Sequence, residues 1–98
     1  EKRRLHIVLG FVKGKAIEEI FALLPKKAIY YLSAPAIARA IPVSKIAVLA
    51  KKNGLAALIF PTVQEATNAA KSAAKEEDVV YVGGSTFVVA EVLSAKMI

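Results

Sequence analysis

Four short apolar segments, each followed by a segment with helical periodicity, constrain the fold of this 98-residue chain more than any other feature. The apolar, β-branched-rich segments cover residues 4–11, 27–33, 56–60 and 78–82. After each, apolar residues recur three or four positions apart, which is typical of an amphipathic helix. This alternation predicts one α/β domain over residues 1–98, a three-layer α/β/α Rossmann-like fold with four parallel strands and four helices. We favour the strand order 3-2-1-4, an order that depends on packing.

Residues with known end preferences mark the predicted helices. Pro25 follows the helix expected at residues 16–24. Pro42 suits the first position of the second helix, and Gly54 suits the left-handed position just past its end. Thr62 and Glu65 form a capping box at the start of the third. The four strands are apolar on both sides, as expected for strands that helices cover on both faces.

Composition excludes several classes of protein. The chain has no cysteine, so it has neither a disulfide framework nor a thiolate metal site. No apolar run reaches the roughly 18 residues of a membrane span, and no signal-peptide pattern opens the chain, so we expect a cytoplasmic protein with no membrane partner. The net charge is +6, but the cations are scattered and no aromatic residues interleave with them. Weak nucleic-acid binding is therefore an unfavoured alternative.

The carboxyl ends of the strands are the expected ligand-binding edge, because ligands of open parallel sheets bind there. Helix starts at this edge add partial positive charge, which favours an anion. The chain supplies cations, glycines and hydroxyls in the loops at this edge. The candidate ligand-binding residues are Lys15, Arg39, Gly83, Gly84, Ser85 and Thr86. Lys13 and Ser33 fall in the same loops. A small anion such as phosphate is the expected ligand.

The Gly83–Thr86 turn raises the question of whether it binds a phosphate or only turns the chain. Its local pattern favours a glycine turn in which Ser85 or Thr86 caps the last helix, which we expect to end near residue 95. The chain has neither a P-loop pattern nor a dinucleotide-binding glycine fingerprint. We therefore expect no nucleoside triphosphate binding by this chain alone.

No residue set predicts catalysis or a metal site. His6 is the only histidine and lies near the amino end of the first strand, away from the expected ligand edge, so we interpret it as structural. Ser85 has no histidine within plausible reach, which argues against a hydrolase triad. Glu91 stands alone in an apolar helix, and we expect one of Tyr30 and Tyr31 in the core.

Two long segments carry a resemblance to a known family. The segments HIVLGFVKGKAIEEIFALLPKKAIYYLSAPAIARAI and DVVYVGGSTFVVAEVL resemble the C-terminal domain of folylpolyglutamate synthase/dihydrofolate synthase, in the Mur ligase family. The resemblance covers nearly the whole chain in order, and VGGSTFVVAEVL is its most specific part. It implies ATP-dependent ligation, in which a carboxylate becomes an acyl phosphate that the amine of glutamate attacks. ATP and magnesium would bind chiefly to a separate ATPase domain with a P-loop, which is the implied partner.

The matched region also departs from the family. Where the family commonly reads Asp-Lys-Asp, this chain has Gly14-Lys15-Ala16, whereas Arg39 and Gly84-Ser85 match. The family's first strand, with its Asp-Gly-Ala-His-Asn-Pro motif, is expected before residue 1. The leading interpretation is an isolated C-terminal domain, natural or engineered, that is not catalytic alone. A free-standing small-anion module is the alternative.

The expected extra strand has a consequence for the sheet. The segment VVYV at residues 79–82 is apolar on both faces, which suits an interior strand. Without a strand beside it, an edge of the sheet would be open, and we expect self-association or coverage by the chain's terminal residues.

Overall fold

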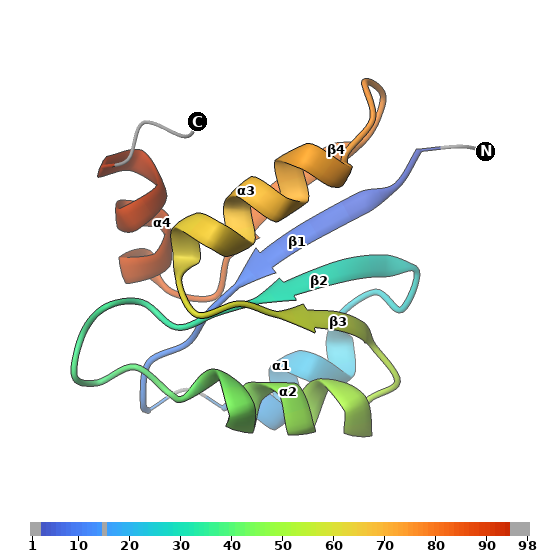
Figure 1. The fold of residues 1–98 in the computed structure, drawn as a ribbon. Coiled ribbons are helices and arrows are strands. Elements are labelled where there is room, and N and C mark those ends of the chain that lie inside the picture. The colour runs from blue at the N-terminus through green and yellow to red at the C-terminus, as the bar shows by residue number, and fades with distance from the viewer. Residues whose placement is uncertain (1–2, 15, 95–98) are drawn as a thin grey trace.

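The structure is a computed structural model that describes residues 3–14 and 16–94. Four strands and four helices alternate along the chain, as the sequence predicts (Figure 1). The strands are β1 (Leu5–Leu9), β2 (Ala28–Leu32), β3 (Ala56–Ile59) and β4 (Val79–Gly83), and the helices are α1 (Ile17–Leu23), α2 (Val43–Lys52), α3 (Val63–Ala73) and α4 (Thr86–Ser94).

All strand pairs in the sheet are parallel, and the order is β3-β2-β1-β4. The predicted order 3-2-1-4 is therefore confirmed. Leu5 of β1 lies opposite both Ala28 of β2 and Val79 of β4, so the three strands begin and end at nearly the same level. Their carboxyl ends consequently meet at one edge of the sheet.

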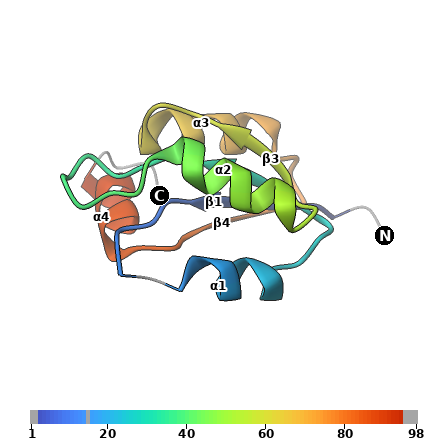
Figure 2. The same ribbon diagram turned by 90° about the horizontal axis from the view of Figure 1, so that it is seen from below.

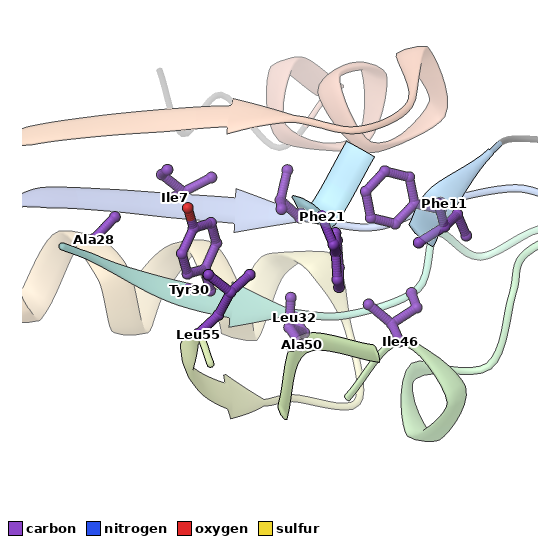
Figure 3. Packing of buried hydrophobic residues seen from close by; sticks show 11 residues of the cluster. Ile7, Phe11, Phe21, Ala28, Tyr30, Leu32, Ile46, Ala50 and Leu55 are labelled. Atoms are coloured by element: carbon purple, nitrogen blue, oxygen red, sulfur yellow. The ribbon is translucent and has the colours of Figure 1, made fainter. Parts of the chain in front are cut away.

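One face of the sheet is covered by α1 and α2, which enclose the larger core (Figures 1 and 2). Figure 3 shows its side chains, with Phe11 and Phe21 next to each other between strand and helix. Their rings meet edge to face with centroids 5.7 Å apart, an arrangement favoured for aromatic pairs. The Tyr30 hydroxyl donates to the carbonyl of Pro25 at 2.5 Å, which satisfies the one polar atom of that buried side chain.

The opposite face is covered by α3, and α4 lies beside α3 at the carboxyl end of the sheet (Figure 1). Ala66 and Ala70 are fully buried against Val8 and Tyr31, and their small side chains let α3 approach closely. Tyr31 is thus buried like Tyr30, on the other face. The sequence predicts one of the two tyrosines in the core, and the structure buries both, because both faces of β2 are covered.

The helix ends follow their local chemistry with one small difference. The Thr62 side chain accepts a hydrogen bond from the backbone N–H of Glu65, as the capping box predicts. Gly54 has φ +72°, the left-handed conformation expected just past α2. Pro42 stands immediately before α2 rather than inside its first turn.

The two outer strands are not covered as the sequence pattern suggests. All four residues of β3 are exposed, and Val79 and Tyr81 of β4 are 46% and 58% exposed. β4 pairs with β1 alone among the described strands, so it is an edge strand in this chain despite its apolar faces. Helix α2 packs beside β2 and β3, because the right-handed crossover from β2 to β3 carries it there.

Candidate ligand-binding edge of the sheet

The loops after β1 and β2 are held together at the carboxyl edge by a short antiparallel pairing. Val12 and Ala40 form the bridge, with the N–H of Lys13 donating to the carbonyl of Arg39 at 2.9 Å. The guanidinium of Arg39 also donates to the carbonyl of Lys13, at 3.4 Å. Two residues that are 26 positions apart in the sequence thus become neighbours. Both are exposed, so solvent and salt screen their attraction for an anion.

The candidate Lys15 lies outside the described residues. The cation that the structure places beside Arg39 is Lys13, which the sequence assigns to the same edge but not to the candidate set. Pairing between two loops leaves no periodic signal in the sequence, so this proximity could not be predicted from it.

The Gly83–Gly84 turn makes close backbone contact with the end of β1. Gly84 has φ +93°, and a Cβ there would lie 2.5 Å from the carbonyl oxygen of Gly10. A Cβ on Gly10 would in turn lie 2.9 Å from both the carbonyl oxygen of Ser33 and a methyl carbon of Val88. The two glycines therefore let three backbone segments meet where α4 starts. This contact supports the prediction that the glycines serve the turn.

Ser85 immediately precedes α4, whose first residue is Thr86. The Ser85 side chain is buried, and its carbonyl accepts hydrogen bonds from the N–H groups of Val88 and Val89 at 3.1 and 3.2 Å. Ser85 thus occupies the capping position of α4, where the sequence predicts a hydroxyl residue. The N–H groups of the first turn of α4 belong to this edge and add partial positive charge to it.

Glu91 has a role that the sequence did not reveal. Its carboxylate accepts a hydrogen bond from the backbone N–H of Ala36 at 2.5 Å. This contact joins α4 to the loop after β2, the same loop that carries Arg39. Nearby, the hydroxyl of Ser33 is fully buried and has no hydrogen-bond partner among the described residues. An acid in an otherwise apolar helix was the available signal, but its partner lies 55 residues away.

A groove of about 470 Å³ lies beside this edge, between the amino-terminal parts of α1 and α2. Its lining includes apolar side chains (Ile17, Ile41 and Leu49) and the cations Lys13 and Lys45, with one acid, Glu18. No group of three histidines and carboxylates that could hold a metal ion occurs within residues 3–14 and 16–94. The described part of the edge therefore offers cations, N–H groups and apolar surface, which suit binding of an anion.

His6 lies at the opposite edge, in a buried hydrogen-bonded chain. Its Nδ1 is 2.8 Å from the Tyr31 hydroxyl, and its Nε2 is 2.9 Å from the Asp78 carboxylate. Asp78 also accepts hydrogen bonds from the backbone N–H groups of Lys75 and Arg4, both at 2.9 Å. The Lys75 bond, followed by those from His6 and Arg4, lowers the pKa of Asp78 to about 2. Burial raises the pKa of Tyr31.

These contacts support the structural interpretation of His6, because both ring nitrogens are engaged within the protein. They join β1, β2 and the turn before β4 at the amino edge of the sheet. The sequence placed Asp78 in that turn without indicating its partners, which are distant in sequence.

No helix in the described part of the chain is long and apolar enough to cross a membrane. No family model matches the sequence, and no curated protein does.

Solved structures match the fold along nearly the whole chain. E. coli FolC in complex with ADP is 28% identical with a TM-score of 0.83, and the match covers 99% of this chain and 23% of that one. The bifunctional folylpolyglutamate synthase/dihydrofolate synthase of Yersinia pestis, complexed with AMPPNP and Mn ion, is 24% identical with the same TM-score and the same coverage. Folylpolyglutamate synthase of Mycobacterium tuberculosis, complexed with ADP and AMPPCP, is 21% identical with a TM-score of 0.76.

The match to the M. tuberculosis enzyme covers 96% of this chain and 24% of the enzyme. This chain therefore spans about a quarter of the enzymes it matches. It has the fold of one part of a folylpolyglutamate synthase, a part whose size fits the C-terminal domain that the sequence resembles.

Proposed function

We propose that this chain is the C-terminal domain of an ATP-dependent ligase of the folate–glutamate type, a binding domain that is not catalytic alone. The observation that carries the proposal is the match to E. coli FolC, which extends over 99% of this chain at a TM-score of 0.83. The motifs that match the family, Arg39 and Gly84-Ser85, belong to loops at the same carboxyl edge.

The chemistry of that edge supports binding rather than catalysis. Exposed Lys13 and Arg39 and the start of α4 can attract a phosphate or a carboxylate. The only histidine of the chain is at the far edge, with both ring nitrogens occupied. A separate ATPase domain with a P-loop, which the family resemblance implies, would supply the main nucleotide and magnesium sites. Closure of that domain over this edge would exclude water and strengthen the electrostatic attraction between these exposed charges and an anion.

A chimera tests this proposal. In E. coli FolC, this chain would replace the matched quarter, and ATP-dependent glutamate ligation would be measured against FolC that lacks the quarter. We expect the chimera to be more active than the truncated enzyme. Arg39→Ala should lower its activity at least tenfold, since its guanidinium would face the closed interface, whereas Lys51→Ala in the last turn of α2, away from this edge, should not. A folded chimera no more active than the truncated enzyme would refute the proposal, as would ligation by this chain alone.

A free-standing small-anion module is the second candidate, and the pairing of Lys13 with Arg39 beside the glycine turn favours it. A phosphate titration of the 98-residue chain, followed by amide chemical shifts, tests it. Shifts confined to Lys13, Arg39 and residues 83–85, with a dissociation constant in the millimolar range, are expected for an exposed site. Salt-sensitive binding of RNA or DNA at scattered lysines would instead support the nucleic-acid alternative.

A further inference from the structure

Among the strands that the structure describes, none pairs with the outer edge of β4. The N–H of Val79 donates to the carbonyl of Arg4, so the backbone of Val79 faces β1. Along a parallel strand, successive residues direct their N–H and C=O groups alternately to the two sides. The backbone groups of Val80 and Val82 therefore face away from β1. No other strand within residues 3–14 and 16–94 pairs with them.

Nothing in the composition of β4 blunts this edge. Natural edge strands are usually protected by charged residues, proline or a bulge, whereas β4 reads VVYVG. Val79 and Tyr81 lie on the same face of the sheet as α1 and α2 but are 46% and 58% exposed there. Val80 and Val82 lie on the other face and pack toward α3. The strand is thus able to pair through its backbone and to bury apolar side chains as it does so.

The β3 edge is a poorer surface for pairing, although Leu58 and Ile59 are exposed there. The N–H of Phe60 donates to Leu32 of β2, so the outward positions of this segment are Ala57, Ile59 and Pro61. Proline has no N–H to donate, which ends the outer row of donors at Pro61. β4 is also one residue longer than β3.

We propose that a second copy of this chain pairs with β4 in antiparallel orientation, about a two-fold axis at Tyr81, to form a continuous eight-stranded sheet. An isologous contact of this kind closes on itself as a dimer. Val80 would lie opposite Val82 of the second copy and exchange both backbone hydrogen bonds with it. Tyr81 would lie opposite its own equivalent in a non-hydrogen-bonded pair, where side chains approach most closely.

Charge supports this antiparallel arrangement. Glu76 and Glu77 are exposed in the turn before β4. With the two-fold axis at Tyr81, they lie beside the start of α4 in the second copy, where helix N–H groups favour negative charge. The two acidic turns are then at opposite ends of the paired strands. A side-by-side parallel arrangement would bring them together and make them repel.

The experiment measures the mass of the 98-residue chain by sedimentation at about 5 μM to 1 mM. We expect the apparent mass to rise toward twice that of the monomer. Tyr81→Lys should keep the chain monomeric, because it places two cations opposite each other. Ile59→Lys is the matched control on the β3 edge, where a residue is equally exposed, and it should still dimerise. Amide exchange at Val80 and Val82 in the unmodified chain should slow with rising concentration, a readout that needs no variant.

Several outcomes would overturn the inference. One is a chain that is still monomeric at about 1 mM. A second is a dimer that Ile59→Lys dissociates and Tyr81→Lys does not. A third is an apparent mass that keeps rising beyond that of a dimer, which indicates an open-ended contact. Exchange at Val80 and Val82 that is independent of concentration would also do so. This dimer is argued from the edge of β4 and not from the proposed ligase function. The mass measurement and the chimera experiment can therefore fail independently of each other.

Discussion

At the scale of single residues, Asp78 links stability to pH. Its pKa is lowered from an ordinary value of 3.8 to about 2 in the folded chain. A lowered pKa means that the ionised carboxylate stabilises the fold above the unfolded value, and that this contribution is lost as pH falls. We expect the free energy of unfolding to decrease between about pH 4 and pH 2. Urea unfolding across this range checks the prediction.

The variant Asp78→Asn provides the control for that experiment. It should be less stable than the unmodified chain at pH 7, because it removes the anion that accepts from Lys75, Arg4 and His6. Its stability should also depend less on pH between 4 and 2. An identical slope in the two proteins would mean that other carboxylates cause the dependence.

Gly84 allows a second comparison at this scale. Gly84→Ala should lower the free energy of unfolding by roughly 1 to 3 kcal/mol or more, because φ is positive and the new Cβ would clash with the carbonyl of Gly10. Gly54→Ala also requires a positive φ but meets nothing within 4 Å, so it should cost only about 1 kcal/mol. Chemical denaturation measures both. Equal losses would show that the contact with Gly10 contributes little.

At the scale of elements, the contact between Glu91 and Ala36 attaches α4 to the loop after β2. Glu91→Ala should lower the free energy of unfolding by about 1 kcal/mol through loss of this hydrogen bond. Glu91→Gln keeps an oxygen acceptor and should lose less. The amide shifts of Ala36 and Arg39 should move in Glu91→Ala if the contact positions the loop. Unchanged shifts would limit the role of Glu91 to α4 itself.

The elements themselves were predictable, since their signals are local. The apolar periodicity placed each strand and helix, and Thr62 and Gly54 marked ends that the structure confirms. The contacts of the candidate site were not predictable. His6 with Asp78 and Lys13 with Arg39 lie 72 and 26 residues apart. Only the register of the sheet and the pairing of two loops bring them together, and neither leaves a local pattern. Binding at Arg39, Gly83, Gly84, Ser85 and Thr86, and at Lys15, stays a prediction.

At the scale of the whole molecule, coverage of the sheet is uneven. Figure 2 shows α1 and α3 on opposite sides of the strands. The right-handed crossover from β2 to β3 places α2 beside those two strands, whereas Val79 and Tyr81 of β4 remain 46% and 58% exposed. Residues 79–82 are apolar on both faces, which is typical of a covered strand, and the sequence alone does not reveal whether a helix covers it.

This uneven coverage predicts that stability depends on protein concentration. If two copies pair through β4, pairing stabilises the folded state alone, and mass action raises the melting temperature as concentration rises. The unmodified chain should melt at a higher temperature at about 500 μM than at about 5 μM, by several degrees when pairing contributes about 1 kcal/mol. Tyr81→Lys should melt at the same temperature at both concentrations, whereas Ile59→Lys should behave like the unmodified chain. Calorimetry measures all three proteins at both concentrations. A melting temperature of the unmodified chain that does not change with concentration would mean that the exposed apolar edge of β4 adds nothing to the stability of this chain.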